Sequence, residues 1–138
     1  MPGIESLIQV EQDETISFGN YSLNEKSKKQ DFEHQGDLYK VKTFYEITKL
    51  ERNGMFVYES VPGTTVSNFT ETDEGITCRL EGYKASQVTV QLEENTAYKI
   101  YEDGEVTGEI TTNISGKLGI NIDLEDGRPV ELQILKVV

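Results

Sequence analysis

Apolar and polar residues alternate with a period of two along much of this 138-residue chain. Turn-forming residues interrupt the alternation roughly every 8–12 residues, a spacing typical of sandwiches and barrels rather than of βαβ units. The residue types agree, because Val, Ile and Thr number 11, 11 and 13 while Ala occurs only twice. β-branched side chains pack well on a pleated surface and lose rotamer freedom on a helix. We therefore expect an all-β protein, an antiparallel β-sandwich.

The alternation is clearest after residue 75. Six apolar series occur there, at residues 76–80, 88–92, 98–100, 106–110, 118–124 and 130–134, with turn signals such as Asp103-Gly104 between them. Short antiparallel strands at this spacing predict an immunoglobulin-like sandwich in residues 64–138. A sandwich of this size buries only about 60% of its unfolded surface. We therefore expect it to pack against the first half of the chain or against a neighbouring subunit.

Residues 1–63 are expected to form a β-hairpin region. Residues 7–10 and 16–18 flank a polar turn and predict a first hairpin. The polar stretch 24–30 has no apolar period and is expected to be a loop, with one helical turn as the alternative. Pro62-Gly63 closes the region, since this dipeptide does not readily continue a strand ladder.

Residues 37–50 are expected to form one strand. Phe44, Ile47 and Leu50 also fit a three-residue spacing, so a local helix stays open as an alternative. Asn53-Gly54 favours the strand, because a type I′ turn needs positive φ at both central residues and Asn-Gly supplies it. This turn predicts a hairpin that continues into residues 55–60.

The charge balance disfavours several kinds of partner. The chain has 25 acidic and 13 basic residues, a net charge of −12, whereas nucleic acids and anionic membranes bind clustered cations. Its longest apolar runs are two or three residues, too short for a membrane span. The N-terminus lacks the features of a secretory signal. A cytoplasmic location is the default expectation, with release in a larger assembly or by a leaderless route as alternatives.

The residue types that usually carry chemistry are sparse. His34 is the single histidine and has no partner nucleophile in a recognisable motif. Cys78 is the single cysteine and alternates with Ile76 and Leu80, which predicts a buried structural thiol. The acidic turns 102–105 and 123–127 offer oxygen ligands for calcium, but hairpin geometry already explains them. We expect no enzyme activity, no catalytic residue, no metal site and no cofactor.

Aromatic residues crowd the hairpin predicted at residues 37–61. Successive side chains on a strand point to opposite faces, so one sheet face cannot bury all of these rings. Either the second half of the chain covers them or some are exposed. Exposed aromatic rows bind sugars or anchor protein interfaces. The predicted binding residues are Tyr39, Phe44, Tyr45, Phe56 and Tyr58.

Two stretches carry a resemblance to known proteins. The sequences YKIYEDGEVTG (98–108) and TTNISGKL (111–118) resemble the last strands of immunoglobulin-like β-sandwich modules appended to surface and carbohydrate-active proteins. The resemblance implies a fold with two tight hairpins in succession rather than an activity.

The first half resembles another group. GDLYKVKT (36–43) and ESVPGT (59–64) are similar to segments of short uncharacterised β-rich proteins of anaerobic Gram-positive bacteria, some of which are labelled endosialidase. The chain has no Trp and lacks the Ser-x-Asp-x-Gly-x-Thr-Trp repeats of a sialidase propeller. No catalytic residue of that family can be placed on this sequence.

Three hypotheses for function follow. The first is a non-catalytic β-sandwich protein that acts through protein contact, by self-association or assembly as a homo-oligomer. The second is a carbohydrate-binding accessory module with a glycan ligand. The third is an acidic-residue glycosidase, which needs two carboxyl groups about 5–10 Å apart. With 25 acidic residues, some pair meets that distance by chance.

Overall fold

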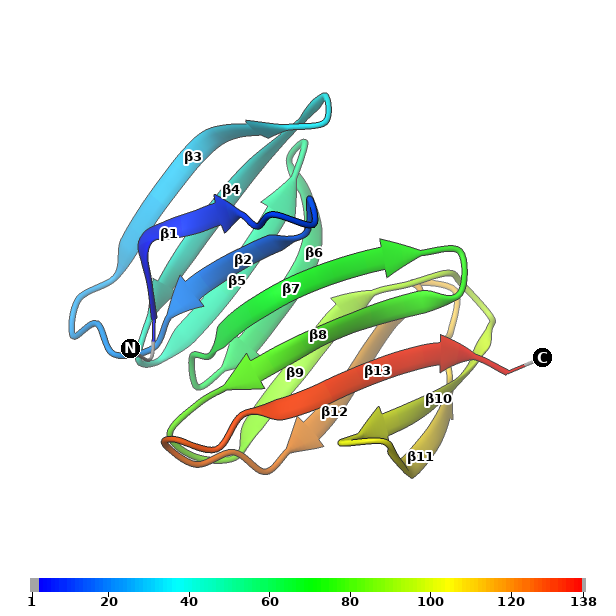
Figure 1. Ribbon diagram of the computed structural model, residues 1–138. Helices are drawn as coiled ribbons and strands as arrows, with labels where there is room; N and C mark the ends of the chain where they lie inside the picture. Colours follow the sequence, from blue (N-terminus) through cyan, green and yellow to red (C-terminus); the bar gives the residue numbers. More distant parts are fainter. Residues whose placement is uncertain (1–2, 138) are drawn as a thin grey trace.

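Residues 3–137, the part of the chain that the computed structural model describes, form 13 strands and no helix. All pairing between the strands is antiparallel (Figure 1). The strands are β1 (Gly3–Val10), β2 (Ile16–Asn20), β3 (Ser27–His34), β4 (Asp37–Phe44), β5 (Ile47–Arg52), β6 (Met55–Val61), β7 (Thr65–Thr72), β8 (Gly75–Glu81), β9 (Ser86–Gln91), β10 (Ala97–Glu102), β11 (Glu105–Thr111), β12 (Lys117–Ile122) and β13 (Val130–Lys136).

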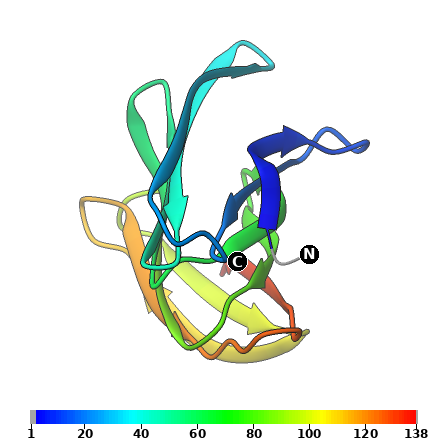
Figure 2. The same cartoon turned by 90° about the vertical axis from the view of Figure 1, so that its left-hand side faces the viewer.

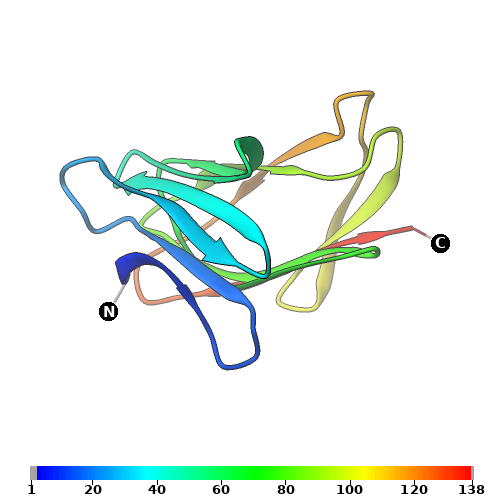
Figure 3. The same ribbon diagram turned by 90° about the horizontal axis from the view of Figure 1, so that it is seen from above.

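The strands build two sheets that face each other as layers (Figure 3). The seven-stranded sheet has the order β1-β2-β7-β8-β13-β10-β11, and the six-stranded sheet has the order β12-β9-β6-β5-β4-β3. The prediction of an all-β antiparallel sandwich is confirmed. The immunoglobulin-like assignment of residues 64–138 stays a prediction.

Each sheet contains strands from both sides of the predicted boundary at residues 63/64. Strand β2 pairs with β7 in one sheet, and β6 pairs with β9 in the other. A single hydrophobic cluster runs through both parts and includes Phe18 and Tyr58 as well as Leu80 and Ile134. Figure 2 shows the hairpins β1–β2 and β3–β4 extending the two layers away from the C-terminal strands. Whether residues 1–63 and 64–138 fold separately stays a prediction.

The alternation in the second half translates directly into burial. Ile76, Cys78 and Leu80 all point into the core from β8, with exposed fractions of 1%, 5% and 0%. Burial raises the pKa of the Cys78 thiol to about 12. The thiol is therefore protonated at neutral pH, and the prediction of a buried structural cysteine is confirmed.

The prediction of one strand over residues 37–50 is wrong, and so is the helical alternative. Phe44 pairs with Ile47 across a two-residue turn at Tyr45-Glu46, so this segment forms the separate strands β4 and β5. The turn lacks the Asn-Gly signal that marks the next one. Asn53 and Gly54 do adopt positive φ, 52° and 79°, as the type I′ turn requires.

The loop predicted at residues 24–30 is also wrong in part, because β3 begins at Ser27. Strand β7 was not predicted at all, because no series of alternating apolar residues marks it. Both strands contain a register shift, and in each an Asp or Asn sits there with positive φ, 58° at Asp31 and 54° at Asn68. Such a bulge adds a residue and breaks the period of two, which hides the strand from pattern analysis.

A network of buried hydroxyl groups surrounds Thr64, where the chain crosses from β6 to β7. Tyr58 Oη and Ser60 Oγ lie 2.7 and 2.8 Å from Thr64 Oγ1. Thr48 Oγ1 donates to the Thr64 carbonyl at 2.7 Å and accepts from its amide at 3.1 Å. Thr43 Oγ1 lies 2.8 Å from Thr48 Oγ1, which extends the network into β4. The crossing is therefore fixed to three strands of the six-stranded sheet.

Replacing Thr64 by Val tests this network. The change keeps the shape of the side chain but leaves the hydroxyls of Tyr58 and Ser60 without their shared partner in a fully buried site. The free energy of unfolding, measured by urea denaturation, is expected to fall by roughly 1–3 kcal/mol. The exposed Thr111→Val is the matched control and is expected to change it by less than about 0.5 kcal/mol. Equal effects of the two changes would show that the network contributes no stability.

Candidate functional site: a tyrosine groove

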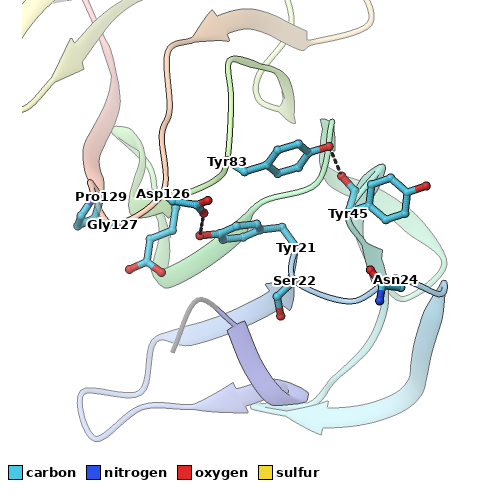
Figure 4. A pocket seen from close by; sticks show the side chains of 9 residues that line it. Tyr21, Ser22, Asn24, Tyr45, Tyr83, Asp126, Gly127 and Pro129 are labelled. Carbon is cyan, nitrogen blue, oxygen red and sulfur yellow. Dashed lines mark hydrogen bonds between the residues drawn. The ribbon is translucent and has the colours of Figure 1, made fainter.

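Four connections converge at one end of the sandwich and enclose a groove of about 760 Å³. They join β2 to β3, β4 to β5, β8 to β9, and β12 to β13. The volume lies in the range of small-molecule sites, about 300–1,000 Å³. Because three tyrosines line it, we call it the tyrosine groove (Figure 4). Its lining residues are Tyr21, Ser22, Asn24, Tyr45, Glu81, Tyr83, Asp126, Gly127 and Pro129.

Tyr21 forms the buried base of the groove and is 5% exposed. Its hydroxyl donates a hydrogen bond of 2.9 Å to Asp126 Oδ1, which joins the β2–β3 connection to the β12–β13 loop (Figure 4). Burial and the neighbouring Asp126 carboxylate both raise the pKa of Tyr21 well above its usual value. The hydroxyl therefore stays protonated and serves as a donor, not as a base.

Tyr83 connects the base of the groove to its rim. Its ring stacks on that of Tyr21, with centroids 6.0 Å apart and an angle of 21° between the planes. Its hydroxyl donates to the carbonyl oxygen of Tyr45 at 3.0 Å. The Lys84 ammonium lies 5.7 Å from the centre of the Tyr83 ring. These contacts fix the orientation of the Tyr83 ring.

Tyr45 supplies the exposed ring of the groove, with 41% of its surface accessible. Its backbone is held on both sides, because its amide donates to the Leu23 carbonyl and its own carbonyl accepts from the Gly63 amide, each at 3.0 Å. Gly63 is needed for this close approach, since a Cβ there would lie 2.1 Å from the Phe44 carbonyl oxygen. A rigid backbone thus presents a solvent-facing ring.

The charges that line the groove are negative. Glu81 and Asp126 are its two ionisable carboxyl groups, and no Lys or Arg is among its lining residues. The nearby Arg128 is paired with Glu125 at 3.7 Å. Carboxylates accept hydrogen bonds from hydroxyl and amine donors, and they repel anions. The groove is therefore suited to a neutral or basic ligand that carries hydrogen-bond donors.

The structure separates the five predicted binding residues. Tyr45 lies in the groove, whereas Tyr39 and Tyr58 belong to the core with exposed fractions of 8% and 0%. Phe44 and Phe56 are half-buried and point away from the core on the outward side of the six-stranded sheet. The core thus covers two of the rings, with Tyr58 packed against Phe18 of β2 and Phe69 of β7, and three rings stay accessible. Binding by any of them stays a prediction.

The sequence patterns did not single out Tyr21 or Tyr83, and they pointed to Asp126 only as part of the acidic turn 123–127. Each lies in a connection, so strand periodicity says nothing about it. A signal was present, however, because Asn20-Tyr21-Ser22 and Gly82-Tyr83-Lys84 place a large aromatic side chain in an otherwise polar turn segment. A turn needs no such side chain for its geometry, which points to packing or binding.

The other residues considered from the sequence lie elsewhere. His34 is the last residue of β3, and its Nε2 is 3.0 Å from the Glu14 carbonyl oxygen. The turns 102–105 and 123–127 contribute to one acidic hollow of about 290 Å³. Within residues 3–137, no three His, Cys, Asp or Glu side chains are placed to hold one metal ion.

No protein-family model matches the chain, and searches of curated proteins and of solved structures return no match. In the described residues there is also no helix that is long and apolar enough to cross a membrane.

The substitution Gly63→Ala tests how the groove is held. The added methyl group would collide with the Phe44 carbonyl and push the Tyr45 turn away from Gly63. The free energy of unfolding is expected to fall by about 1–3 kcal/mol. Amide chemical shifts of residues 44–46 and 83 are expected to move together. Gly108→Ala is the control, because its Cβ would meet only Ile100 Cδ1 at 3.9 Å. Unchanged shifts at Tyr45 in Gly63→Ala would show that Gly63 does not position the groove.

Proposed function

We propose that the protein is a non-catalytic carbohydrate-binding module and that the tyrosine groove holds a segment of a neutral glycan. The observation that carries this proposal is the convergence of three tyrosines and Asp126 from four connections, together with Glu81 at the end of β8, on one open groove.

The chemistry of a sugar matches the groove in two ways. A pyranose ring has apolar C–H faces, and flat aromatic rings bury such faces with little loss of conformational entropy. Tyr45 offers an exposed ring for this contact, and Tyr83 is half-buried beside it. The hydroxyl groups of the sugar would donate to Glu81 and Asp126, the carboxylates of the lining.

The same carboxylates define which glycans are excluded. A sialylated or sulfated glycan would bring a second negative charge next to Glu81 and Asp126, in a chain whose net charge is −12. Like charges brought together in a partly desolvated groove cost free energy. We therefore expect neutral sugars or amino sugars as ligands, and no binding of polysialic acid.

The groove is also preorganised. The hydrogen bonds from Tyr21 to Asp126 and from Tyr83 to the Tyr45 carbonyl are made within the protein and hold these side chains in place. Binding would then require little ordering of side chains, which favours affinity. The absence of catalysis stays a prediction. Self-association would use another surface, the outward face of the six-stranded sheet.

A glycan array followed by calorimetry tests the proposal. Neutral oligosaccharides are expected to bind, and sialylated ones are not. Tyr45→Ala is expected to weaken binding roughly 3–10-fold, because it removes one aromatic stacking contact of about 0.5–1.5 kcal/mol. Tyr101→Ala is the control, since Tyr101 is a half-buried tyrosine on the outward side of the seven-stranded sheet.

Three results would contradict the proposal. These are the absence of any neutral ligand, equal affinities of Tyr45→Ala and the unmodified protein, and preferential binding of polysialic acid. If the protein hydrolyses a bound glycan and Glu81→Gln abolishes this activity, the protein is a glycosidase and not a binding module.

A further inference from the structure

Lysines gather on the outward face of the six-stranded sheet. The register places Lys28 of β3, Lys42 of β4 and Lys49 of β5 directly opposite one another in a row. Lys40 and Lys117 point to the same side, since each lies next to a buried residue that points inward. We call this surface the lysine face, and its cations are Lys28, Lys40, Lys42, Lys49 and Lys117.

The lysines of this row repel one another, which lowers the stability of the isolated chain. Residues directly opposite in an antiparallel pair have Cβ atoms about 4.5–5.5 Å apart, and like charges in such pairs are destabilising. Lys49 is paired with Glu51 at 3.6 Å, and the register places Glu59 of β6 directly opposite Lys49 on the same face. Among residues 3–137, no carboxylate lies within ion-pair distance of Lys28 or Lys42. An acidic surface placed over the row would turn this repulsion into attraction.

The lysine face also carries apolar surface. Phe44 and Phe56 are half-buried there, and the Lys117 ammonium lies 4.8 Å from the centre of the Phe56 ring. Val61, in β6, is 51% exposed and pairs with Gln87 on the same side. A mixture of cations with accessible aromatic and aliphatic side chains is typical of protein interfaces rather than of solvated sheet faces.

The same molecule offers the complementary surface. The β10–β11 turn and the β12–β13 loop surround the acidic hollow at the end of the seven-stranded sheet. Its lining contains one cation, Arg128, which is paired with Glu125. The acidic residues of the hollow are Glu102, Asp103, Asp123 and Glu125.

We propose that the lysine face of one copy of this chain docks onto the acidic hollow of a second copy. The charges are opposite and both surfaces are exposed on the single chain. Because the two patches differ, the contact is head-to-tail and leaves one free patch of each kind on every pair. Such a contact continues into rings or open chains rather than closing as a two-fold dimer.

Light scattering coupled to size exclusion tests the contact. At an ionic strength of about 0.02 M, charges are weakly screened, and the mean mass is expected to exceed that of a monomer and to rise with protein concentration. At about 1 M, where the Debye length is about 3 Å, the protein is expected to be monomeric.

The variant Lys42→Glu separates association from folding. It turns both repulsive pairs of the row, with Lys28 and Lys49, into attractive ones, so the midpoint of thermal unfolding is expected to rise by about 2–4 °C. Association at low ionic strength is nevertheless expected to be lost. Lys99→Glu is the control, because it makes the same charge change on the outward side of the other sheet and is expected to associate normally.

Several outcomes would overturn the proposal. They are a wild-type protein that stays monomeric at low ionic strength, a Lys42→Glu variant that still associates, and a Lys99→Glu variant that loses association to the same extent. If the protein stays monomeric but binds polyglutamate in a way that depends on Lys42, the lysine face binds an acidic partner other than a second copy of this chain. Glycan binding by Lys42→Glu should equal that of the wild type, so failure of this contact and failure of the proposed function are distinguishable.

Discussion

The buried hydroxyl of Thr64 fixes the place where the chain passes from one sheet to the other. Tyr58 and Ser60 meet at this oxygen, and the backbone of Thr64 is bonded to Thr48. Buried polar groups are costly unless each has a partner. Within residues 3–137, every buried side-chain nitrogen and oxygen has one. The network therefore favours a single arrangement of the crossing and tolerates little displacement.

The groove depends on this crossing through a short series of contacts. Gly63, which precedes Thr64, bonds to the carbonyl of Tyr45, and the same carbonyl accepts from Tyr83. Tyr83 stacks on Tyr21, which bonds to Asp126 in the last long loop. Each contact joins segments that are distant in sequence. The core thus determines the positions of the surface side chains that line the groove.

The two proposed surfaces place different demands on the sandwich. The groove uses connections at one end, whereas the lysine face uses the flat outward side of the six-stranded sheet. Four N-terminal strands, β3 to β6, extend β9 and β12 into that wide sheet and supply four of the five lysines. The N-terminal region thus completes the sandwich and adds a charged surface to an acidic protein.

The sequence predicted the parts of the fold that follow a strict period of two. The strands around Cys78 and the type I′ turn at Asn53-Gly54 are such parts, because each depends on local residue types. Bulged strands were missed where Asp31 or Asn68 takes positive φ, since the added residue shifts the pattern. The groove could not be predicted, because its residues meet only through tertiary contacts such as that between Tyr21 and Asp126.

Native-state hydrogen exchange tests most directly whether the core holds the groove in a preformed state. The amides of Tyr45, Gly63 and Thr64 donate to Leu23, Tyr45 and Thr48. If these bonds open only when the whole sandwich unfolds, all three amides exchange with the free energy of global unfolding. Exchange of the Tyr45 and Gly63 amides at a much lower free energy, while core amides stay protected, would contradict the account.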